Sequence, residues 1–408
     1  MVKKKFLFIS SMNLASNPRI LKEIKLALSE GHHVTFAGFK LGDWSDEKDM
    51  LIRQGIPDVN CIYFEATRIN FWQWFYDSVM ERMARIAWPL FRNNLFLTAL
   101  AHSKRTLSLL RFSGKVHPGE YDIVAGHTLA ALYPVYKTAV KAKCIYSFDV
   151  EDYHPGERIV IDAKNEIKRR ELLLKKLLPG ASIIIAASPL IAKAIDGLVS
   201  KISTPIYPVL NYFPVAEFIK PLPTTDNRMR MVWFSQHISF GRGLEAILAI
   251  WDKLNEHFHL TLIGNLDKVF YDAVIVGKEN IEIKTAMSQD DLHKELSNYD
   301  IGLAIEMRSA DLNRNICITN KLLAYFQAGL YIIATDTDAQ KEFMMQYPQH
   351  GITVTKHSPE ILQVLKNIYT NKEQIRSGSF SRFDNASNES WEKEASQIKI
   401  LWQTKLTA

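Results

Sequence analysis

Short runs of apolar residues alternate with longer segments in which apolar residues recur every three or four positions. The segment 17–31, NPRILKEIKLALSEG, has this helical spacing, with Asn17 as N-cap, Pro18 in the first turn and Gly31 at the end. Near-continuous apolar strands separated by helices are typical of a parallel sheet that is covered on both faces. In the first half we predict strands at 5–11, 33–39, 122–127, 144–150 and 182–188.

The alternation breaks at 211–229, where three prolines and polar residues indicate an interdomain linker. It then restarts, with Ser288 and Asp291 spaced as a capping box before a helix, and with an amphipathic helix at 389–406. Strands are predicted at 231–235, 259–264, 301–305, 331–335 and 352–354. We therefore predict an N-terminal domain at 1–210, a linker at 211–229, a C-terminal domain at 230–385, and a last helix at 386–408 that packs back on the first domain.

Composition agrees with a globular chain of this organisation. The 408 residues suit two domains of about 150–200 residues, and 47% are hydrophobic. Three widely spaced cysteines form no CxxC pair, which argues against a zinc site and fits a reducing compartment. The apolar run 6–12 is too short for a signal peptide, and no stretch approaches the roughly 18–20 residues of a membrane span. We expect a cytoplasmic protein.

The net charge of +6 is concentrated in one segment. Residues 66–115 hold eight basic groups against Asp77 and Glu81, within a predicted helical insert at 66–118. Within it, 69–97 combines aromatic residues with arginines at helical spacing. One interpretation is that this segment contacts an anionic membrane surface peripherally, and the other is that it packs on the N-terminal sheet. In the membrane interpretation, the residues at the bilayer surface would be Trp72, Trp74, Phe75, Trp88, Phe91, Arg82, Arg85 and Arg92. Nucleic acid is not predicted as a partner, because no known reader pattern occurs.

Two loops of the second half could bind an anion. Ligands of doubly wound sheets bind beyond the carboxyl ends of strands, where helices begin with unpaired N–H groups. In TNKLLAYFQAGLYIIAT (319–335), Lys321 would add a full charge to such a helix start, although a solvated turn with an incidental lysine has the same spacing. In SQHISFGRGLEAIL (235–248), Gly241 and Gly243 would let the backbone approach a ligand while Arg242 points at it, although GxG is often only a tight turn.

These stretches resemble GT-B glycosyltransferases, particularly the large family 4 group. The segment 300–335 resembles the family's donor-binding strand, polar loop, S/T-N-K turn, helix and following strand. The segments 17–39, 207–214 and 234–245 resemble its first helix and second strand, the approach to its linker, and its basic-Gly loop. The resemblance covers most of the chain except 66–118. It implies an α/β fold with two doubly wound Rossmann-like domains facing each other across a cleft.

The resemblance also implies roles for individual residues. Arg242 and Lys321 would neutralise the diphosphate of a nucleotide sugar, with Gly241 and Gly243 shaping the loop and Thr319 and Asn320 supplying backbone donors. Tyr325 and Gly329 would hold the helix, and Glu306 would reach the sugar or nucleotide. One departure is that the family's E-x7-E pair falls on Ile316 and Ala324, which leaves Glu306 as the substitute for ribose recognition.

The implied activity is transfer of a sugar from a nucleotide-sugar donor to a glycan or lipid-linked acceptor. The family implies retention of configuration by front-face attack, and the two cations make a metal or another cofactor unnecessary. It also implies a role in bacterial surface polysaccharide or lipopolysaccharide assembly, in the cytoplasm or peripherally on the inner membrane. The alternative is a catalytically silent GT-B-like protein that binds a nucleotide or a protein partner, which Ala324 keeps open.

The N-terminal half would then hold the acceptor. SFDVEDYHPGER (147–158) follows a strand, and alternation sends Asp149 and Glu151 to one side and Asp152 to the other, with His154 nearby. These groups could orient acceptor hydroxyls or take up a proton. The open alternatives are an acidic loop that caps Arg158 or the next helix, and the DxD metal site of one-sheet GT-A enzymes.

Two more strand ends of this half carry candidates. His127 could hydrogen-bond the transferred sugar or be a satisfied structural residue. Asn13, Asn17 and Arg19 follow the first strand and could contact the acceptor. Arg19 could equally pair with a neighbouring carboxylate.

Overall fold

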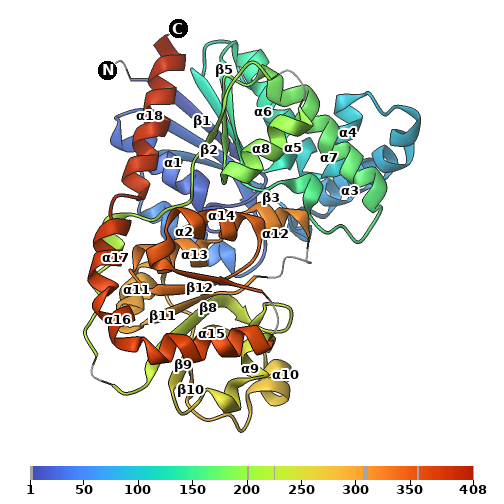
Figure 1. Cartoon of the computed structure of the whole chain (residues 1–408). Coiled ribbons are helices and arrows are strands. Elements are labelled where there is room, and N and C mark those ends of the chain that lie inside the picture. Colours follow the sequence, from blue (N-terminus) through green and yellow to red (C-terminus); the bar gives the residue numbers. More distant parts are fainter. Residues whose placement is uncertain (1–2, 200–201, 225, 307–310, 356–357, 408) are drawn as a thin grey trace. The chain divides into compact units, whose positions relative to one another are not determined.

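The computed structural model describes residues 3–199, 202–224, 226–306, 311–355 and 358–407, and the chain divides into two compact units. Unit 1 comprises Met1–Val209 with Ala395–Ala408, and unit 2 comprises Leu210–Glu394. Each unit contains one parallel β-sheet with helices packed on it (Figure 1). The predicted fold class, two doubly wound Rossmann-like α/β domains, is confirmed.

Unit 1 has a seven-stranded sheet in the order β3-β2-β1-β4-β5-β6-β7, with every neighbouring pair parallel. The chain runs outward from β1 through β2 to β3 and then returns to the other side of β1, so the order reverses between β1 and β4. Such a reversal is where ligands bind in doubly wound sheets. The strands are β1 (Lys5–Ser10), β2 (His33–Lys40), β3 (Val59–Glu65), β4 (Ile123–His127), β5 (Ile145–Val150), β6 (Ile183–Ala186) and β7 (Ile206–Pro208).

The helices of unit 1 bury one apolar face each. In α1, Ile20, Ile24 and Ala27 face the core, and the side chain of Asn17 caps the helix by accepting from the N–H of Ile20. The segment 66–118 forms helices, and α3 and α4 share a small core of their own around Trp88. The helices are α1 (Pro18–Ser29), α2 (Ser45–Gln54), α3 (Phe71–Ala87), α4 (Leu95–His102), α5 (Arg105–Ser113), α6 (Leu129–Ala142), α7 (Ala163–Leu177), α8 (Pro189–Leu198) and, from Ala395 on, α18 (Trp391–Thr407).

Unit 2 has a six-stranded parallel sheet in the order β10-β9-β8-β11-β12-β13, which reverses between β8 and β11. Its strands are β8 (Met229–Ile238), β9 (Phe258–Leu266), β10 (Ile281–Lys284), β11 (Ile301–Ala304), β12 (Tyr331–Thr335) and β13 (Gly351–Val354). Its helices are α9 (Leu244–Leu248), α10 (Lys268–Phe270), α11 (Gln289–Glu295), α12 (Leu312–Ile316), α13 (Asn320–Gln327), α14 (Asp338–Gln346), α15 (Ser358–Thr370), α16 (Lys372–Ser377) and α17 (Ser379–Ala386).

The Pro-rich segment 211–229, predicted as a linker, packs on unit 2. Tyr212, Phe213 and Phe218 are buried in a core cluster of that unit. The backbone N–H and C=O of Phe213 bond the side-chain amide of Gln327 on α13, both at 2.9 Å. These contacts fix the start of unit 2 against the helix that begins at the Thr-Asn-Lys turn.

Candidate functional site

The predicted cation Lys321 lies at the strand-order reversal of unit 2. Its Nζ is 3.0 Å from Oε1 of Glu306, the second residue after β11, and 5.4 Å from the ring centre of Trp233 on β8. The side chains of Lys321 and Glu306 are 13% and 15% exposed. Lys321 is therefore held at the carboxyl ends of β8 and β11 rather than spread into solvent.

The backbone of Glu306 is anchored by a residue that sequence reasoning did not single out. Thr335, the last residue of β12, accepts a hydrogen bond from the N–H of Glu306 at 2.8 Å and donates one to its carbonyl at 3.0 Å. A threonine at the carboxyl end of the strand next to β11 was the available signal. Thr335 gives the Lys321–Glu306 pair a fixed support.

The loop that carries Arg242 reaches the same strand ends. Gly241 and Gly243 adopt φ of +75° and +88°, and the N–H of Gly241 bonds Oε1 of Glu245 at 2.6 Å. A Cβ at Gly243 would lie 2.6 Å from Cγ2 of Ile305, the neighbour of Glu306. The glycine therefore lets the backbone beside Arg242 pack on Ile305, next to the residue that pairs with Lys321.

The other predicted donor residues divide into a cap, a surface contact and a core residue. Thr319 caps α13, and its hydroxyl accepts from the N–H of Leu322. The side-chain oxygen of Asn320 accepts from Asn211 at 2.9 Å. Tyr325 is fully buried under β11, where a Cβ at Gly302 would lie 2.3 Å from its ring. Tyr325 therefore packs α13 against β11.

Ile316 and Ala324, which stand where the E-x7-E pattern has glutamates, are both buried apolar residues. Ile316 is 7% exposed and Ala324 is 0% exposed, and Ala324 belongs to the apolar core under α13. Residues 307–310 of the predicted polar loop lie outside the described part of the chain. Among the described residues, Glu306 is the carboxylate paired with Lys321.

At the strand-order reversal of unit 1, His127 ends β4 among carboxylates. It is in register with Ser10 of β1 and with Asp149 of β5. Its Nδ1 lies 2.7 Å from Oε1 of Glu151 and 3.8 Å from Oδ2 of Asp149, and its Nε2 lies 3.4 Å from Oε1 of Glu23. The predicted sharing of one side by Asp149 and Glu151 is thus observed.

Arg19 takes the second of its two predicted partners, a neighbouring carboxylate. Its Nε and Nη2 bond the two oxygens of Asp149 at 2.7 and 3.0 Å, and its Nη1 bonds the carbonyl of Val209 at 3.0 Å. Their side chains are 11% and 2% exposed, so this bidentate pair is a buried support of the site.

The ionisation states of this cluster follow from burial and charge together. Burial alone would lower the pKa of His127, but the carboxylates of Glu23 and Glu151 raise it to about 10. Burial also opposes ionisation of Glu151, yet the hydrogen bond from His127 and that residue's charge hold the Glu151 pKa below its usual value. A protonated His127 is thus fixed against Glu151, whose side chain is 17% exposed and is the most accessible of the three carboxylates.

Glu23, His127 and Asp149 also have the donor types of a metal site, with ligand atoms within 4.8 Å of one another. The donors do not fit a metal well, because Arg19 occupies both oxygens of Asp149 and the raised pKa of His127 keeps its ring protonated. Glu23 was missed from the sequence. Its signal was an acidic residue on the apolar face of α1, between Ile20 and Ile24.

The remaining predicted acceptor residues serve the loops around this cluster. Asn13 is fully buried and donates to Ser45 at 2.7 Å and to Asp46 at 3.1 Å. His154 pairs with Glu157 at 2.8 Å, and Asp152 is half-buried beside it, with its carbonyl accepting from the His154 N–H. Asn13, Asn17 and His154 thus each have an internal partner, and their geometry favours shaping the loops over contacting a ligand.

A strained residue marks the same strand ends. Thr128, directly after His127, has φ of +69°, which non-glycine residues rarely adopt. Its hydroxyl accepts from the N–H of Ser11 at 3.1 Å, which ties the loop after β1 to the loop after β4. Strain of this kind is concentrated at functional sites.

No protein-family model and no curated protein sequence matches the chain. Among solved structures, HepE of Anabaena in complex with UDP is similar over 98% of this chain and 100% of that one, with 12% identity and a TM-score of 0.68. Sucrose-phosphate synthase from Thermosynechococcus elongatus covers 98% and 99%, with 12% identity and a TM-score of 0.67. A putative UDP-N-acetylglucosamine 2-epimerase from Listeria monocytogenes covers 97% and 95%, with 14% identity and a TM-score of 0.56. Other HepE structures contain UDP with glucose, or UDP-glucose.

The chain has the GT-B fold. This excludes the one-sheet GT-A alternative for the FDVED segment, because β5 lies inside the seven-stranded sheet of a two-sheet protein. Unit 2 carries Arg242, Glu306 and Lys321 in the loops around the reversal of its strand order. Unit 1 carries the His127 cluster, which comprises Arg19, Glu23, His127, Asp149 and Glu151, at the reversal of its own strand order.

Unit 1 of this GT-B chain also exposes an apolar surface, here called the α3 face. Trp72, Ile86 and Leu90 are 77%, 74% and 81% exposed. The face comprises Ile69, Phe71, Trp72, Phe75, Tyr76, Val79, Met83, Ile86, Leu90, Phe91 and Phe96. Trp88, predicted at a membrane surface, is instead 1% exposed and donates to Thr98, because its ring fills the core between α3 and α4. No helix among the described residues is long and apolar enough to cross a bilayer.

Proposed function

We propose that the protein is a glycosyltransferase, related to family 4, that moves a sugar from a nucleotide-sugar donor to a glycan or lipid-linked acceptor. The observation that carries the proposal is Lys321, held by Glu306 and Trp233 at the strand-order reversal of unit 2, with Gly243 packed on Ile305, the residue before Glu306. The UDP, glucose and UDP-glucose complexes of HepE, a protein of the same fold, support a nucleotide-sugar donor.

In this proposal Lys321 and Arg242 bind the diphosphate of the donor. Negative charge grows on the diphosphate as the bond to the sugar breaks, so preorganised cations lower the barrier. Glu306 pairs with Lys321 and, when the phosphates of a donor engage Lys321, would be free to accept a hydrogen bond from a sugar or ribose hydroxyl. These cations make a metal or another cofactor unnecessary for departure of the leaving group.

Unit 1 would bind the acceptor, with Glu151 as the carboxylate that contacts it. Glu151 is the most accessible carboxylate of the His127 cluster, while Arg19, His127 and Asp149 are buried behind it and position it. We propose retention of configuration by front-face attack, which needs no nucleophilic side chain. Surface polysaccharide or lipopolysaccharide assembly at the cytoplasmic side of the membrane is the role that this chemistry and the α3 face fit.

The test is a screen of UDP, GDP, ADP and CDP sugars by thermal shift, followed by transfer assays with radiolabelled donors. A donor at 100 times its Kd stabilises the protein by about 2.7 kcal/mol. We expect one nucleotide class to bind and to release its sugar to an acceptor extract. Binding without turnover across all donors would favour the silent alternative. Conversion of a donor to its epimer without an acceptor would favour an epimerase, the activity named for the Listeria protein.

The matched variants are Lys321→Ala and Lys341→Ala. Lys341 is an exposed lysine on α14 of the same unit. Lys321→Ala should lower kcat about 10²–10³-fold, the usual cost of losing one donor to a developing charge. Lys341→Ala should leave kcat unchanged. Equal activity of the two variants would remove Lys321 from the mechanism.

We further propose that the α3 face lies on an anionic bilayer, where a lipid-linked acceptor would be found. Its apolar side chains recur along one side of α3, and Arg82 and Arg92 are exposed beside them. The acidic residues of 69–97 are neutralised internally, since Asp77 pairs with Arg111 and Glu81 with Arg85. Exposed aromatic residues with unneutralised arginines are the composition of interfacial helices.

Vesicle sedimentation tests the α3 face. The wild-type protein should bind vesicles that contain anionic lipid and should bind neutral vesicles weakly, since each arginine near an anionic surface contributes about 1 kcal/mol. The double variant Trp72→Ala/Ile86→Ala should lose most of this binding. Met345→Ala removes an apolar side chain that is 72% exposed on unit 2, and should change nothing. Equal binding of both variants would point to packing against a protein instead.

A further inference from the structure

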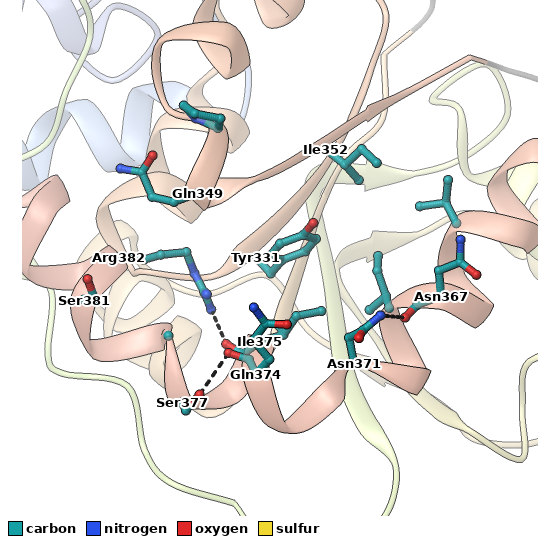
Figure 2. A pocket seen from close by; sticks show the side chains of 14 residues that line it. Tyr331, Gln349, Ile352, Asn367, Asn371, Gln374, Ile375, Ser377, Ser381 and Arg382 are labelled. Atoms are coloured by element: carbon teal, nitrogen blue, oxygen red, sulfur yellow. Dashed lines mark hydrogen bonds between the residues drawn. The ribbon is translucent and has the colours of Figure 1, made fainter.

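A cavity lies at the opposite end of the unit 2 sheet from Lys321. It has a volume of about 630 Å³, within the usual range for small-molecule sites. Tyr331 and Ile352, at the amino ends of β12 and β13, form its floor, and α15, α16 and α17 contribute its walls (Figure 2). Parallel strands place their carboxyl ends together at one edge, so this cavity is separate from the donor site.

Arg382 on α17 is the charged residue of the described cavity wall. It is 5% exposed, its Nε donates to the carbonyl of Gly329 at 3.0 Å, and its Nη2 donates to the carbonyl of Ile375 at 3.0 Å. No hydrogen bond is found from its Nη1 to any described residue. A Cβ at Gly378 would lie 2.9 Å from this atom, so the glycine leaves Nη1 room beside the cavity.

The charge of Arg382 has no carboxylate in contact with it among the described residues. The acid of this region, Asp300, is engaged by Arg376 at 3.2 Å and by the N–H of Arg230 at 2.8 Å. Burial lowers the pKa of Arg382 to about 10, although the charge of Asp300 opposes this change, and the guanidinium carbon lies 5.7 Å from the ring centre of Tyr331. A buried charge without a counter-ion is costly unless a partner supplies one.

The rest of the wall offers neutral hydrogen-bonding groups. Amides come from Gln349, Asn367, Asn371 and Gln374, and hydroxyls come from Ser377 and Ser381. Figure 2 shows Gln349 and Arg382 on one side of Tyr331 and Asn367 and Asn371 on the other. Amides and hydroxyls of this number suit a ligand that carries several hydroxyl groups, and the single cation suits one negative group.

We propose that this cavity binds a small hydroxylated anion, with its carboxylate or phosphate on Nη1 of Arg382 and its hydroxyls on the surrounding amides. This inference does not depend on the proposed sugar transfer, because the cavity lies at the amino end of β12 and Thr335, which bonds Glu306, lies at the carboxyl end.

Isothermal titration of the full chain tests the site with three probes that share a sugar ring: glucose 6-phosphate, glucuronate and glucose. We expect at least one anion to bind with a Kd of about 1 mM or lower and glucose to bind much more weakly. The two anions distinguish a phosphate from a carboxylate ligand. Absence of saturable binding by either anion, or equal binding of glucose, would overturn the proposal.

Two substitutions at one position locate the binding. Arg382 itself supports the fold through two carbonyls, so the variants use Ser381, an exposed residue of the same wall. Ser381→Asp places a negative charge near the guanidinium and should raise the Kd of the anion about tenfold or more, whereas Ser381→Asn should not. Anion binding should persist in Lys321→Ala. Equal affinities of the Asp and Asn variants, or loss of binding in Lys321→Ala, would assign the anion to another site.

Discussion

At the scale of single residues, the His127 cluster shows how neighbouring charges decide which side chain can work. Arg19 and His127 are the cations, and Glu23, Asp149 and Glu151 are the carboxylates around them. Each isolated charge would be costly at this depth, and burial raises the pKa of Asp149 even beside Arg19, whereas the hydrogen bond from His127 lowers the pKa of Glu151. The consequence is a rigid group of charges whose stability depends on the proton of His127.

This dependence predicts a pH effect on stability. The pKa of His127 is raised from its usual 6.5 to about 10 in the folded protein, so its contribution is fully present below pH 6.5 and is lost as the pH rises to about 10. Denaturant unfolding between pH 6.5 and 10 should therefore show a falling free energy of unfolding. His127→Gln should flatten this fall, while His33→Gln, at an exposed position of β2, should not. Equal slopes for the two variants would contradict the assignment.

The sequence predicted which residues lie at the strand ends but not which of them pair. Asp149 and His127 follow or end apolar runs, and that pattern is local. The Arg19–Asp149 pair joins positions 130 apart in the chain, and the choice between a ligand and a neighbouring carboxylate for Arg19 depended on the strand order. Strand order places β1, β4 and β5 together, and no single stretch of sequence contains it.

At the scale of elements, the turn after β8 needs two glycines for different reasons. Gly241 and Gly243 both have positive φ. Nothing lies within 4 Å of a Cβ built at Gly241, whereas a Cβ at Gly243 would collide with Ile305. Gly241 therefore supplies backbone freedom alone, and Gly243 supplies both freedom and the close approach that brings Arg242 to β11.

Replacing each glycine by alanine separates these two effects. Gly241→Ala should cost about 1–2 kcal/mol, the penalty of a left-handed non-glycine residue. Gly243→Ala should cost more, because Ile305 must also move, and it should weaken donor binding. Urea unfolding and donor titration measure the two quantities. Equal losses in both variants would show that the contact with Ile305 does not matter.

Most elements were predictable because their apolar residues are contiguous, and the strands that were missed lack this feature. In β3, polar Asn60 interrupts the run, and most of its side chains are only partly buried. Both β7 and β10 are short, with three and four residues, and neither contains a fully buried side chain. All three lie toward sheet edges, where one neighbour is absent and less apolar surface is needed.

At the scale of the whole molecule, unit 1 is built from two distant pieces of the chain. Trp402 on α18 is 2% exposed, and its ring centre lies 4.8 Å from that of Phe6 on β1. Lys399 pairs with Glu30 at 2.7 Å. The sequence predicted this helix from its periodicity, and the indole in the core shows what the helix contributes to unit 1.

Truncating that indole should destabilise unit 1 in particular. Trp402→Ala should cost about 3–5 kcal/mol, as for other large aromatic residues removed from a core. Ile400 lies on the same helix and is 61% exposed, so Ile400→Ala should cost little. Hydrogen exchange followed by mass spectrometry should show faster exchange in β1 and β2 of the Trp402 variant and unchanged exchange in the unit 2 strands. Uniform acceleration in both units would mean that they unfold together.

The divided construction of unit 1 sets an order on its biosynthesis. A ribosome completes all of unit 2 before it makes residues 395–408, so the first 209 residues emerge without the helix that covers Phe6. Unit 2, which is continuous in the chain, can reach its final structure earlier although its synthesis starts later. Until residues 395–408 are made, the nascent N-terminal part of unit 1 keeps an uncovered aromatic surface of the kind that chaperones bind.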